Sequence, residues 1–421
     1  MRHRGIREVI QGEKSRLQPH NWITDDTRLP SMSGSQEWND PSPMGVNSTA
    51  EGALGGGGGQ RALTPRSASV ALKARSEAVE GVRWAEDAGF SKEQVDEFRQ
   101  LLSLVEYCFI PHDEIKESNK IAEGSFGTIF KGEYRGERVA VKRIIKDASG
   151  TKSLSQRMRE VLLEVSVLSR IHHPHVVRFL GVAAHFPKDK KTAEGGLFLG
   201  MVFELCERGT LYSRIHDNRG HKLSGEAKVR IGKDIASGMA YVHSLNIVHR
   251  DLSDRNVLIH SDSKVKVADF GCARKINGTE YRSSTISGSP AFMAPEQLGG
   301  KMLSLKVDVW ALGTILWELF TEKKPWEDAS NKVAGMAGLE LLRDQVVAKG
   351  QRLPQPPSEC LPSGHERDLK RLIDSCLQRT AAQRLSMAEA LVSLEAVYDT
   401  MKLQHQKSKA ASKAQKAAAA A

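Results

Sequence analysis

Two short stretches near the middle of the chain decide the fold: VHRDLSDRNVLI at residues 248–259 and VADFG at residues 267–271. In the first, Asp251 and Asn256 lie five residues apart, a spacing that lets one loop present a carboxylate base and an amide metal ligand together. In the second, Asp269 ends a short apolar run 18 residues after Asp251, where its carboxylate can hold a divalent cation. Together these residues predict a polar site built around a metal ion.

Upstream, the segment IAEGSFGTIFKG (121–132) predicts a hairpin with Gly124 and Gly127 at its tip. Glycine backbone can approach a polyphosphate closely and offer N–H groups to its oxygens. Many hairpins contain glycines, however, so an ordinary turn is the commoner meaning of this segment when it is taken alone.

A lysine and a glutamate between these segments strengthen the case for a phosphate site. Lys142 ends the strand-like run VAVK (139–142), so it is either an exposed edge residue or a cation that reaches into a cleft. Glu164, in the helical segment REVLLEVSVL (159–168), can pair with Lys142 and aim its ammonium group. Further on, SPAFMAPEQ (289–297) places Glu296 27 residues after Asp269.

Taken in this order, the glycine loop, VAVK, the helix glutamate, HRD with an asparagine five residues on, DFG and APE resemble the motifs of the protein kinases. The resemblance spans about Asn119 to Tyr398. It implies an α+β, bilobal protein kinase fold, with a small β-rich N-lobe that contains one helix and a larger, mainly α C-lobe. It also implies that DVWALG (308–313) belongs to the family's long buried helix and that Arg384 pairs with Glu296.

The reaction that this resemblance implies is transfer of the γ-phosphoryl group of ATP to a protein hydroxyl, with Mg²⁺ as cofactor. Asp251 is expected to orient the acceptor hydroxyl and accept its proton, and Asn256 and Asp269 to hold Mg²⁺. Lys142, fixed by Glu164, is expected to bind the α- and β-phosphates. The other residues implied to contact ATP lie in the glycine loop, the adjoining strands, the hinge and the floor of the pocket: Ile121, Ala122, Gly124, Ser125, Phe126, Gly127, Ile129, Ala140, Phe203, Glu204, Cys206 and Leu258.

Within the hinge, Phe203 is expected to narrow the back of the adenine pocket, and the backbone of Glu204 and Cys206 to hydrogen-bond adenine. Ala122 departs from the family pattern because it stands where the first glycine of the loop is usual. It leaves Gly124 and Gly127 in place, so we expect at most a weaker affinity for ATP.

The catalytic loop departs further. Ser253 stands where serine/threonine kinases have a lysine, and Arg255 stands where tyrosine kinases have an arginine that can reach the same space, so Arg255 is implied to be catalytic. GSPAFMAPE (288–296) instead resembles the serine/threonine form. Such mixed features resemble the tyrosine-kinase-like group, whose members mostly phosphorylate serine and threonine.

We therefore expect a serine/threonine kinase that acts in signal transduction, on protein substrates, with an upstream kinase as a further partner. Dual or tyrosine specificity is the alternative. A pseudokinase scaffold is the rival from another class of protein, but it commonly lacks one of the residues that here are Lys142, Asp251 and Asp269.

Four regions are expected along the chain. Residues 1–75 are rich in Gly, Ser, Pro and Asn and predict disorder. Residues 76–113 predict a helical segment that Ser91 caps, with an apolar face of Val95, Phe98, Leu101, Leu102 and Val105; this helix either packs on the main domain or binds a regulator. Residues 117–400 form the kinase domain, and residues 401–421 are a Lys/Ala-rich tail.

Composition excludes several classes of protein. The 421 residues include 40% hydrophobic and 27% charged residues, which fits neither a wholly disordered chain nor a membrane protein. No secretory signal is visible, the longest apolar run (309–320) is too short to span a bilayer, and five scattered cysteines suit a reducing compartment. The net charge of +10 is partly due to five lysines after residue 401, so nucleic acid is not expected as a partner. We expect a cytoplasmic protein, with the nucleus as the alternative.

Overall fold

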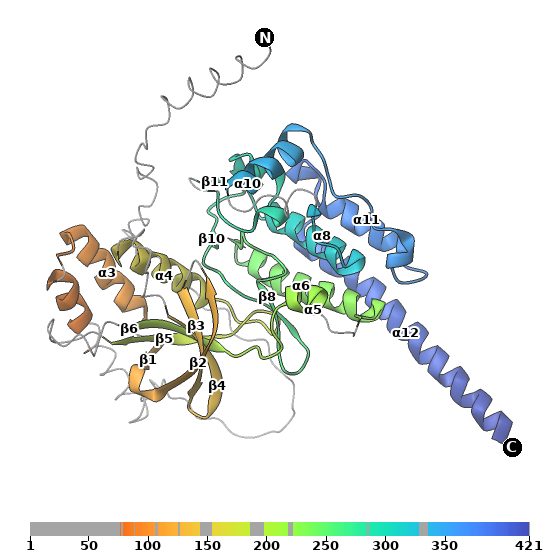
Figure 1. Cartoon of the computed structure of the whole chain (residues 1–421), viewed down its shortest axis with the longest axis horizontal. Helices are drawn as coiled ribbons and strands as arrows, with labels where there is room; N and C mark the ends of the chain where they lie inside the picture. The colour runs from red at the N-terminus through yellow and green to blue at the C-terminus, as the bar shows by residue number, and fades with distance from the viewer. Residues whose placement is uncertain are drawn as a thin grey trace, which may run out of the picture. The chain divides into compact units, whose positions relative to one another are not determined.

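The computed structural model describes residues 76, 79–87, 89–105, 108–124, 127–143, 154–185, 198–217, 222–283, 286–327 and 336–420. The ordered elements form a small lobe built on a β-sheet and a larger lobe built from helices (Figure 1). The bilobal fold that the sequence motifs imply is therefore confirmed. Among the described helices, none combines the length and the apolar character needed to cross a lipid bilayer.

The small lobe contains a six-stranded sheet. All neighbouring strands are antiparallel except the short first strand, which runs parallel to its neighbour. In the order in which they pair, the strands are β1 (Phe109–Pro111), β5 (Phe179–His185), β6 (Phe198–Glu204), β4 (Glu137–Arg143), β3 (Gly127–Tyr134) and β2 (Ile115–Gly124). Arg135 and Gly136 both have positive φ, at 53° and 81°, and make the tight turn from β3 to β4.

Two helices of this lobe bear on the site. α4 (Leu154–Leu168) follows β4, and α3 (Lys92–Val105) precedes the sheet after a further helical stretch at residues 79–87. The predicted cap of α3 is confirmed, because the Gln94 N–H donates to Ser91 Oγ at 3.3 Å and the Ser91 N–H donates to Gln94 Oε1 at 3.0 Å. This reciprocal pair of hydrogen bonds is a capping box, which fixes where the helix begins.

The large lobe surrounds one apolar helix. Its helices are α5 (Leu211–His216), α6 (Gly225–Ser244), α7 (Pro295–Leu298), α8 (Lys306–Thr321), α10 (Met336–Arg343), α11 (Glu366–Cys376) and α12 (Met387–Ala420). Three two-stranded ladders complete it: β7 (Ile247–Val248) with β10 (Arg274–Lys275), β8 (Val257–Ile259) with β9 (Val265–Val267), and β11 (Tyr281–Arg282) with β12 (Met302–Leu303). Every residue of α8 from Val307 to Phe320 is buried, which confirms the predicted buried helix.

The predicted pair of Arg384 and Glu296 is also confirmed. Arg384 Nη1 and Nη2 donate to the two carboxylate oxygens of Glu296 at 2.6 and 2.8 Å, and the guanidinium lies 5.1 Å from the ring centre of Trp310. The Arg384 side chain has no exposed surface, so the pair ties α7 to the segment before α12 inside the protein.

Removing the arginine should therefore be costly. We expect Arg384→Ala to lower the free energy of unfolding by about 3–5 kcal/mol, because Glu296 is left as a buried charge without its partner. Urea denaturation followed by circular dichroism measures the change. Arg367→Ala, which removes a side chain that is 95% exposed, is the control and should change stability by about 0.5 kcal/mol or less. Equal effects of the two substitutions would contradict this account of the pair.

Candidate active site

A buried lysine joins three elements at the centre of the site. Val139 and Val141 of β4 belong to the apolar cluster on one face of the sheet, so Lys142 lines the cavity on the other face. Its Nζ atom lies 3.1 Å from Glu164 Oε1 of α4 and 3.0 Å from Asp269 Oδ1 of the segment after β9. The structure thus brings together a strand, a helix and a loop that are far apart in the sequence.

Burial and pairing compete in setting the protonation of this group. Burial disfavours the ammonium form, but the carboxylates of Glu164 and Asp269 raise the pKa of Lys142 well above its usual range. Burial also raises the pKa of Glu164, against the pull of the lysine. For Asp269, burial is outweighed by Lys142, and the pKa stays below its ordinary value. The lysine is therefore charged at any physiological pH.

The backbone at Asp269 is held in an uncommon conformation. Its φ of 60° lies in the left-handed region, which costs energy for a residue other than glycine and recurs at functional sites. Phe270 is buried, and its ring packs on His249 with 4.7 Å between ring centres. The consequence is that the carboxylate faces Lys142 while the neighbouring phenylalanine anchors the loop in the core.

Hydrogen bonds fix the Asp251 carboxylate in the second loop. Ser289 donates to Asp251 Oδ1 through both its N–H and its Oγ, each at 2.7 Å. Asn256 Nδ2 donates to Asp251 Oδ2 at 3.0 Å and to the Asp251 carbonyl at 2.8 Å. Because the amide nitrogen of Asn256 is used in this way, its amide oxygen is the atom left for a metal ion. With the Asp269 carboxylate it forms an oxygen donor set that fits Mg²⁺.

The same loop is anchored from below by α8. Asp308 accepts hydrogen bonds from the backbone N–H groups of His249 and Arg250 at 2.8 and 2.9 Å, and its Oδ2 lies 2.9 Å from His243 Nε2. Although burial opposes the charge, the histidines and these N–H groups hold the pKa of Asp308 below its ordinary value. The buried helix therefore sets the position of the residues next to Asp251.

A cavity of about 490 Å³ opens above these residues. Most of the predicted contacts line it: Ile121, Ala122, Ile129, Ala140, Lys142, Glu164, Phe203, Glu204, Cys206, Arg255, Asn256, Leu258 and Asp269. Sequence reasoning missed Val177, Thr210 and Ala268, which also line it. Ala268 is adjacent to a motif residue, whereas Thr210 forms a bridge with Leu258 that only the fold reveals.

The predicted glycine hairpin is present. Gly124 pairs with Gly127 at the end of the β2–β3 ladder, and Gly127 has a φ of 128°, which favours glycine. Ser125 and Phe126 at its tip lie outside the described residues. Gly127 is not among the described residues that line the cavity.

The hinge presents backbone and not side-chain charge to the cavity. Glu204 Oε1 accepts from the Arg178 N–H at 2.7 Å and lies 2.7 Å from Lys266 Nζ, so its side chain is committed elsewhere. The Glu204 N–H also donates to the Arg178 carbonyl, at 3.0 Å. The carbonyl oxygen is therefore the group that Glu204 can offer to a base in the cavity. Phe203 packs on Phe179, with 5.6 Å between ring centres.

Ser253 and Arg255 have opposite surroundings. Ser253 is fully buried, and its Oγ has no hydrogen-bond partner among the described residues. Arg255 is exposed, and its guanidinium carbon lies 3.7 Å from the ring centre of Tyr212. Of the two, only Arg255 is placed to meet a ligand.

A second arginine faces the segment after DFG. Arg250 Nη2 donates to Ser283 Oγ at 2.9 Å and to Ser287 Oγ at 2.8 Å. Residues 284 and 285 of this segment lie outside the described residues.

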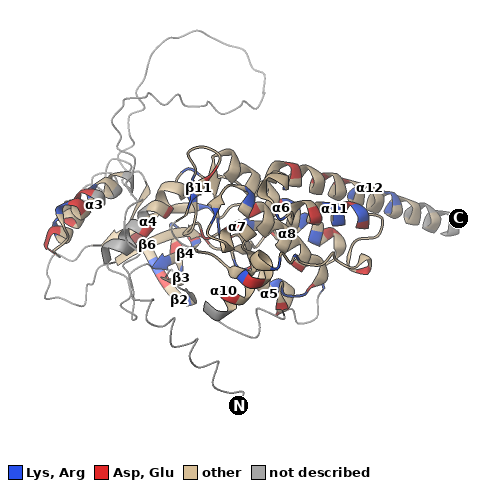
Figure 2. Cartoon of the chain, turned by 90° about the horizontal axis from the view of Figure 1, so that it is seen from above, with Lys and Arg blue, Asp and Glu red and all other residues tan. Residues whose placement is uncertain are grey.

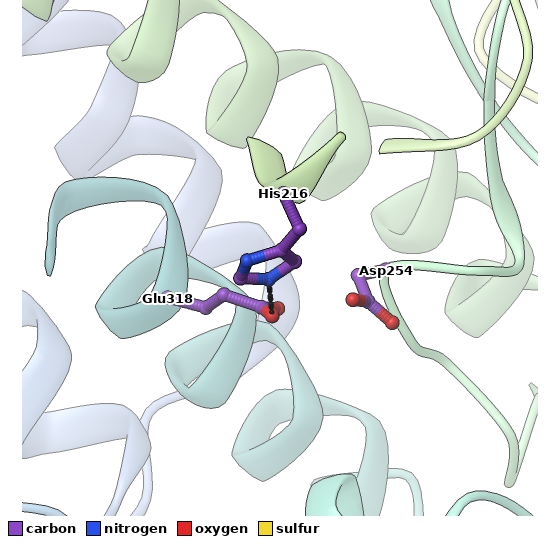
Figure 3. Close-up of side chains that lie close together, drawn as sticks. All are labelled: His216, Asp254 and Glu318. Atoms are coloured by element: carbon purple, nitrogen blue, oxygen red, sulfur yellow. Dashed lines mark hydrogen bonds and ion pairs between the residues drawn. The ribbon is translucent and has the colours of Figure 1, made fainter. Parts of the chain in front are cut away.

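A cluster that no motif predicts lies beneath the catalytic loop. His216 of α5, Asp254 of the loop and Glu318 of α8 have donor atoms within 4.8 Å of one another (Figure 3). His216 Nε2 lies 2.8 Å from Glu318 Oε1, whereas the buried Glu318 Oε2 has no hydrogen-bond partner among the described residues. One imidazole and two carboxylates have the donor chemistry of a metal site, but a single proton shared between the carboxyl groups also satisfies Oε2.

The electrostatics favour the shared proton. Burial and the nearby Glu318 raise the pKa of Asp254 to about 7. Burial raises the pKa of Glu318 to about 8, against smaller opposing effects of Asp254, Arg255 and Lys324. Burial also lowers the pKa of His216, so the imidazole is neutral near pH 7.

Comparison with known proteins gives one family. The model described as protein tyrosine and serine/threonine kinase matches residues 115–394. The probable serine/threonine-protein kinase SIS8 of Arabidopsis thaliana is 32% identical over 292 residues, which cover 68% of this chain and 25% of that protein. The Arabidopsis serine/threonine-protein kinase CTR1 is 36% identical over 220 residues, covering 52% and 25%. The dual specificity protein kinase shkD of Dictyostelium discoideum is 31% identical over 287 residues, covering 68% and 35%. The chain thus spans about a quarter to a third of the length of these relatives.

The acid cluster should make stability fall as pH rises. Asp254 and Glu318 have higher pKa values in the folded protein than when unfolded, so their contribution is complete below about pH 4 and is lost through pH 7–8. Glu318→Gln mimics the protonated acid, so we expect it to match the wild type at pH 4 and to raise Tm by roughly 2–4 °C at pH 9.

Differential scanning fluorimetry at the two pH values measures this. Glu395→Gln on the exposed face of α12 is the matched control and should leave the difference in Tm between the two pH values unaltered. A Glu318→Gln protein that is equally destabilised at both pH values would contradict the shared proton.

Proposed function

The chain belongs to the protein tyrosine and serine/threonine kinase family, and on this premise we propose that it transfers the γ-phosphoryl group of ATP to serine and threonine hydroxyls of protein substrates. The observation that carries the proposal is the ion pair of Lys142 with Glu164 next to an Asp251 carboxylate that two neighbours fix. The positions that phosphoryl transfer needs are filled by residues of the required chemistry.

In this proposal Asp251 receives the proton of the acceptor hydroxyl. Ser289 and Asn256 hold its two oxygens, so the carboxylate is aimed before the substrate arrives. Such positioning replaces covalent chemistry in phosphoryl transfer, where orientation and charge stabilisation supply most of the acceleration.

Lys142 binds the phosphates of ATP, with Glu164 keeping its ammonium in place. Mg²⁺, when bound by Asn256 and Asp269, neutralises charge on the phosphate oxygens. The direct contact of Lys142 with Asp269, at 3.0 Å, gives way as each takes its own partner. The apolar walls of the cavity, among them Ile129 and Leu258, suit the adenine ring.

Arg255 supports an assignment to the tyrosine-kinase-like group. Because Ser253 is buried, it cannot take the place of the lysine of other serine/threonine kinases, and Arg255 on the surface of the cavity is the cation available for the transferred phosphate. Relatives named as serine/threonine kinases and as a dual specificity kinase occur side by side, so dual specificity is the second candidate.

Further predictions accompany this function. The Arg250 guanidinium donates hydrogen bonds to Ser283 and Ser287. Phosphorylation of this segment by an upstream kinase would give Arg250 a charged phosphate as a stronger partner. The cytoplasm is the proposed location, which agrees with five unpaired cysteines. The division into 1–75, 76–113, 117–400 and 401–421 and the lack of a nucleic-acid partner stay predictions from the sequence.

The decisive experiment combines purified protein, Mg-ATP and myelin basic protein as a generic acceptor. We expect phosphoserine and phosphothreonine with the wild type. Asp251→Asn should lower kcat by roughly 10²–10⁴-fold, because it removes the proton acceptor while keeping the shape of the side chain. Asp269→Ala should also lose transfer. Asp262→Asn, in an exposed turn, is the matched control and should keep full activity.

Other results would change the assignment. Phosphotyrosine among the products would establish the dual specificity candidate. No transfer by the wild type, even after treatment with a candidate upstream kinase, would overturn the enzyme and favour the pseudokinase scaffold.

The role of Arg255 has a separate test. We expect Arg255→Ala to lower kcat roughly tenfold, the effect of losing about 1.4 kcal/mol of transition-state stabilisation. Tyr212→Phe, which keeps the ring under the guanidinium, should retain activity close to that of the wild type. Steady-state kinetics with saturating ATP measure both. An unaltered kcat in Arg255→Ala would remove Arg255 from the mechanism.

A further inference from the structure

The helix that carries Glu164 needs something to hold it in place. Among the described elements, α3 is the one that packs most closely on α4, and both views show the two helices side by side (Figure 1, Figure 2). α3 ends before residue 115, where the match to the kinase family begins. The support of α4 therefore comes from outside the region that the family shares.

The contact is apolar on both sides. Val95, Phe98 and Leu102 form one face of α3, at a spacing of three and four residues, and Val95 and Phe98 are buried. They belong to the same apolar cluster as Val161 and Val165 of α4. The opposite side of α3 carries exposed polar residues, as the charge colouring of the helix in Figure 2 shows. α3 is thus an amphipathic helix whose apolar face is buried against the small lobe.

α4 is buried on two sides. Glu164 and Leu168 line the cavity, while Val161 and Val165 are buried in the same large apolar core as Val95 and Phe98 of α3. Glu164 lies between the two valines in sequence, so a displacement of their face moves the carboxylate as well. Protein interiors are closely packed, so a small displacement of one buried side chain is transmitted to its neighbours.

α3 is itself held firmly. The capping box of Ser91 and Gln94 fixes its start. Ala85, in the helical stretch at residues 79–87, is fully buried in the same cluster. Arg99 lies 3.7 Å from Glu86, which joins α3 to that stretch. Residues 79–105 are therefore a helical pair attached to the small lobe.

A second carboxylate competes with Glu164 for the lysine. Lys142 also contacts Asp269 at 3.0 Å, so it stays paired when Glu164 withdraws. Asp269 is then the carboxylate that pairs with the lysine, which disfavours the release of Asp269 to a metal ion and of Lys142 to ATP. The position of α4 therefore decides whether Lys142 has one of these carboxylate partners or both.

We propose that Phe98 is a positioning residue for phosphoryl transfer: through the contact of α3 with α4, it keeps Glu164 on Lys142. The proposal rests on the kinase function proposed above. It assigns to residues 79–105 a part in the activity, in addition to their contribution to stability.

The test uses full-chain variants in the assay with Mg-ATP and myelin basic protein. Phe98→Ala should lower kcat/KM for ATP roughly tenfold, the result of a change of about 1.4 kcal/mol, and should leave KM for the acceptor protein unaltered. Phe98→Leu, which restores an apolar side chain, should recover most of the activity. Gln100→Ala, on the exposed side of α3, should behave as the wild type.

Two measurements separate positioning from general loss of stability. Leu394→Ala removes a fully buried side chain from α12 in the large lobe, and it should lower Tm without changing kcat/KM for ATP. Amide hydrogen exchange of residues 160–168 should accelerate in Phe98→Ala, while exchange in α6 and α8 keeps the wild-type rate.

The outcomes are separable. Wild-type kcat/KM in Phe98→Ala, unaltered exchange in α4, or exchange that rises equally in α6 and α8 would each overturn the positioning role. If the wild type shows no transfer at all, the proposed function fails, and the exchange of α4 still decides whether Phe98 holds that helix.

Discussion

The arrangement of this protein depends on one buried ammonium group. Lys142 is almost entirely removed from water, and a charge in that position costs several kcal/mol unless it is paired. Its partners, Glu164 and Asp269, come from α4 and from the loop after β9. The sheet, the helix and the large lobe must therefore meet at one point, and the cavity is the space that remains between them.

The buried carboxylates below the site also need partners, and most of them are hydrogen-bond donors. Asp308 receives two backbone N–H groups and contacts a histidine, and Asp251 receives donors from Ser289 and Asn256. Each acid is fixed because its hydrogen bonds are complete. Asp254 and Glu318 are different, since burial raises the pKa of both acids against the opposing effect of Arg255, and a shared proton compensates for their proximity. The contact between Asp254 and Glu318 is therefore a part of this loop whose protonation changes with pH.

The sequence predicts the parts whose chemistry depends on local spacing. Asp251 and Asn256 lie in one loop, Lys142 ends an alternating strand, and Ser91 and Gln94 form a capping box, so each could be identified from a few adjacent residues. The cluster of His216, Asp254 and Glu318 could not, because its members come from three segments that only the fold unites (Figure 3). The burial of Ser253 was equally hidden, since a hydroxyl gives no sign of which way it faces.

The amphipathic face of α3 is the intermediate case. Its period is visible in the sequence, but a period shows only that a surface is covered and not by what. In the structure, α4 packs on α3. Because α4 carries Glu164, the packing of α3 bears on the active site as well as on stability. A small lobe with one helix on its sheet buries little apolar surface, and such small units are marginally stable. Residues 79–105 add buried side chains to that core. The apolar core around α4 therefore extends beyond the region that the chain shares with its family.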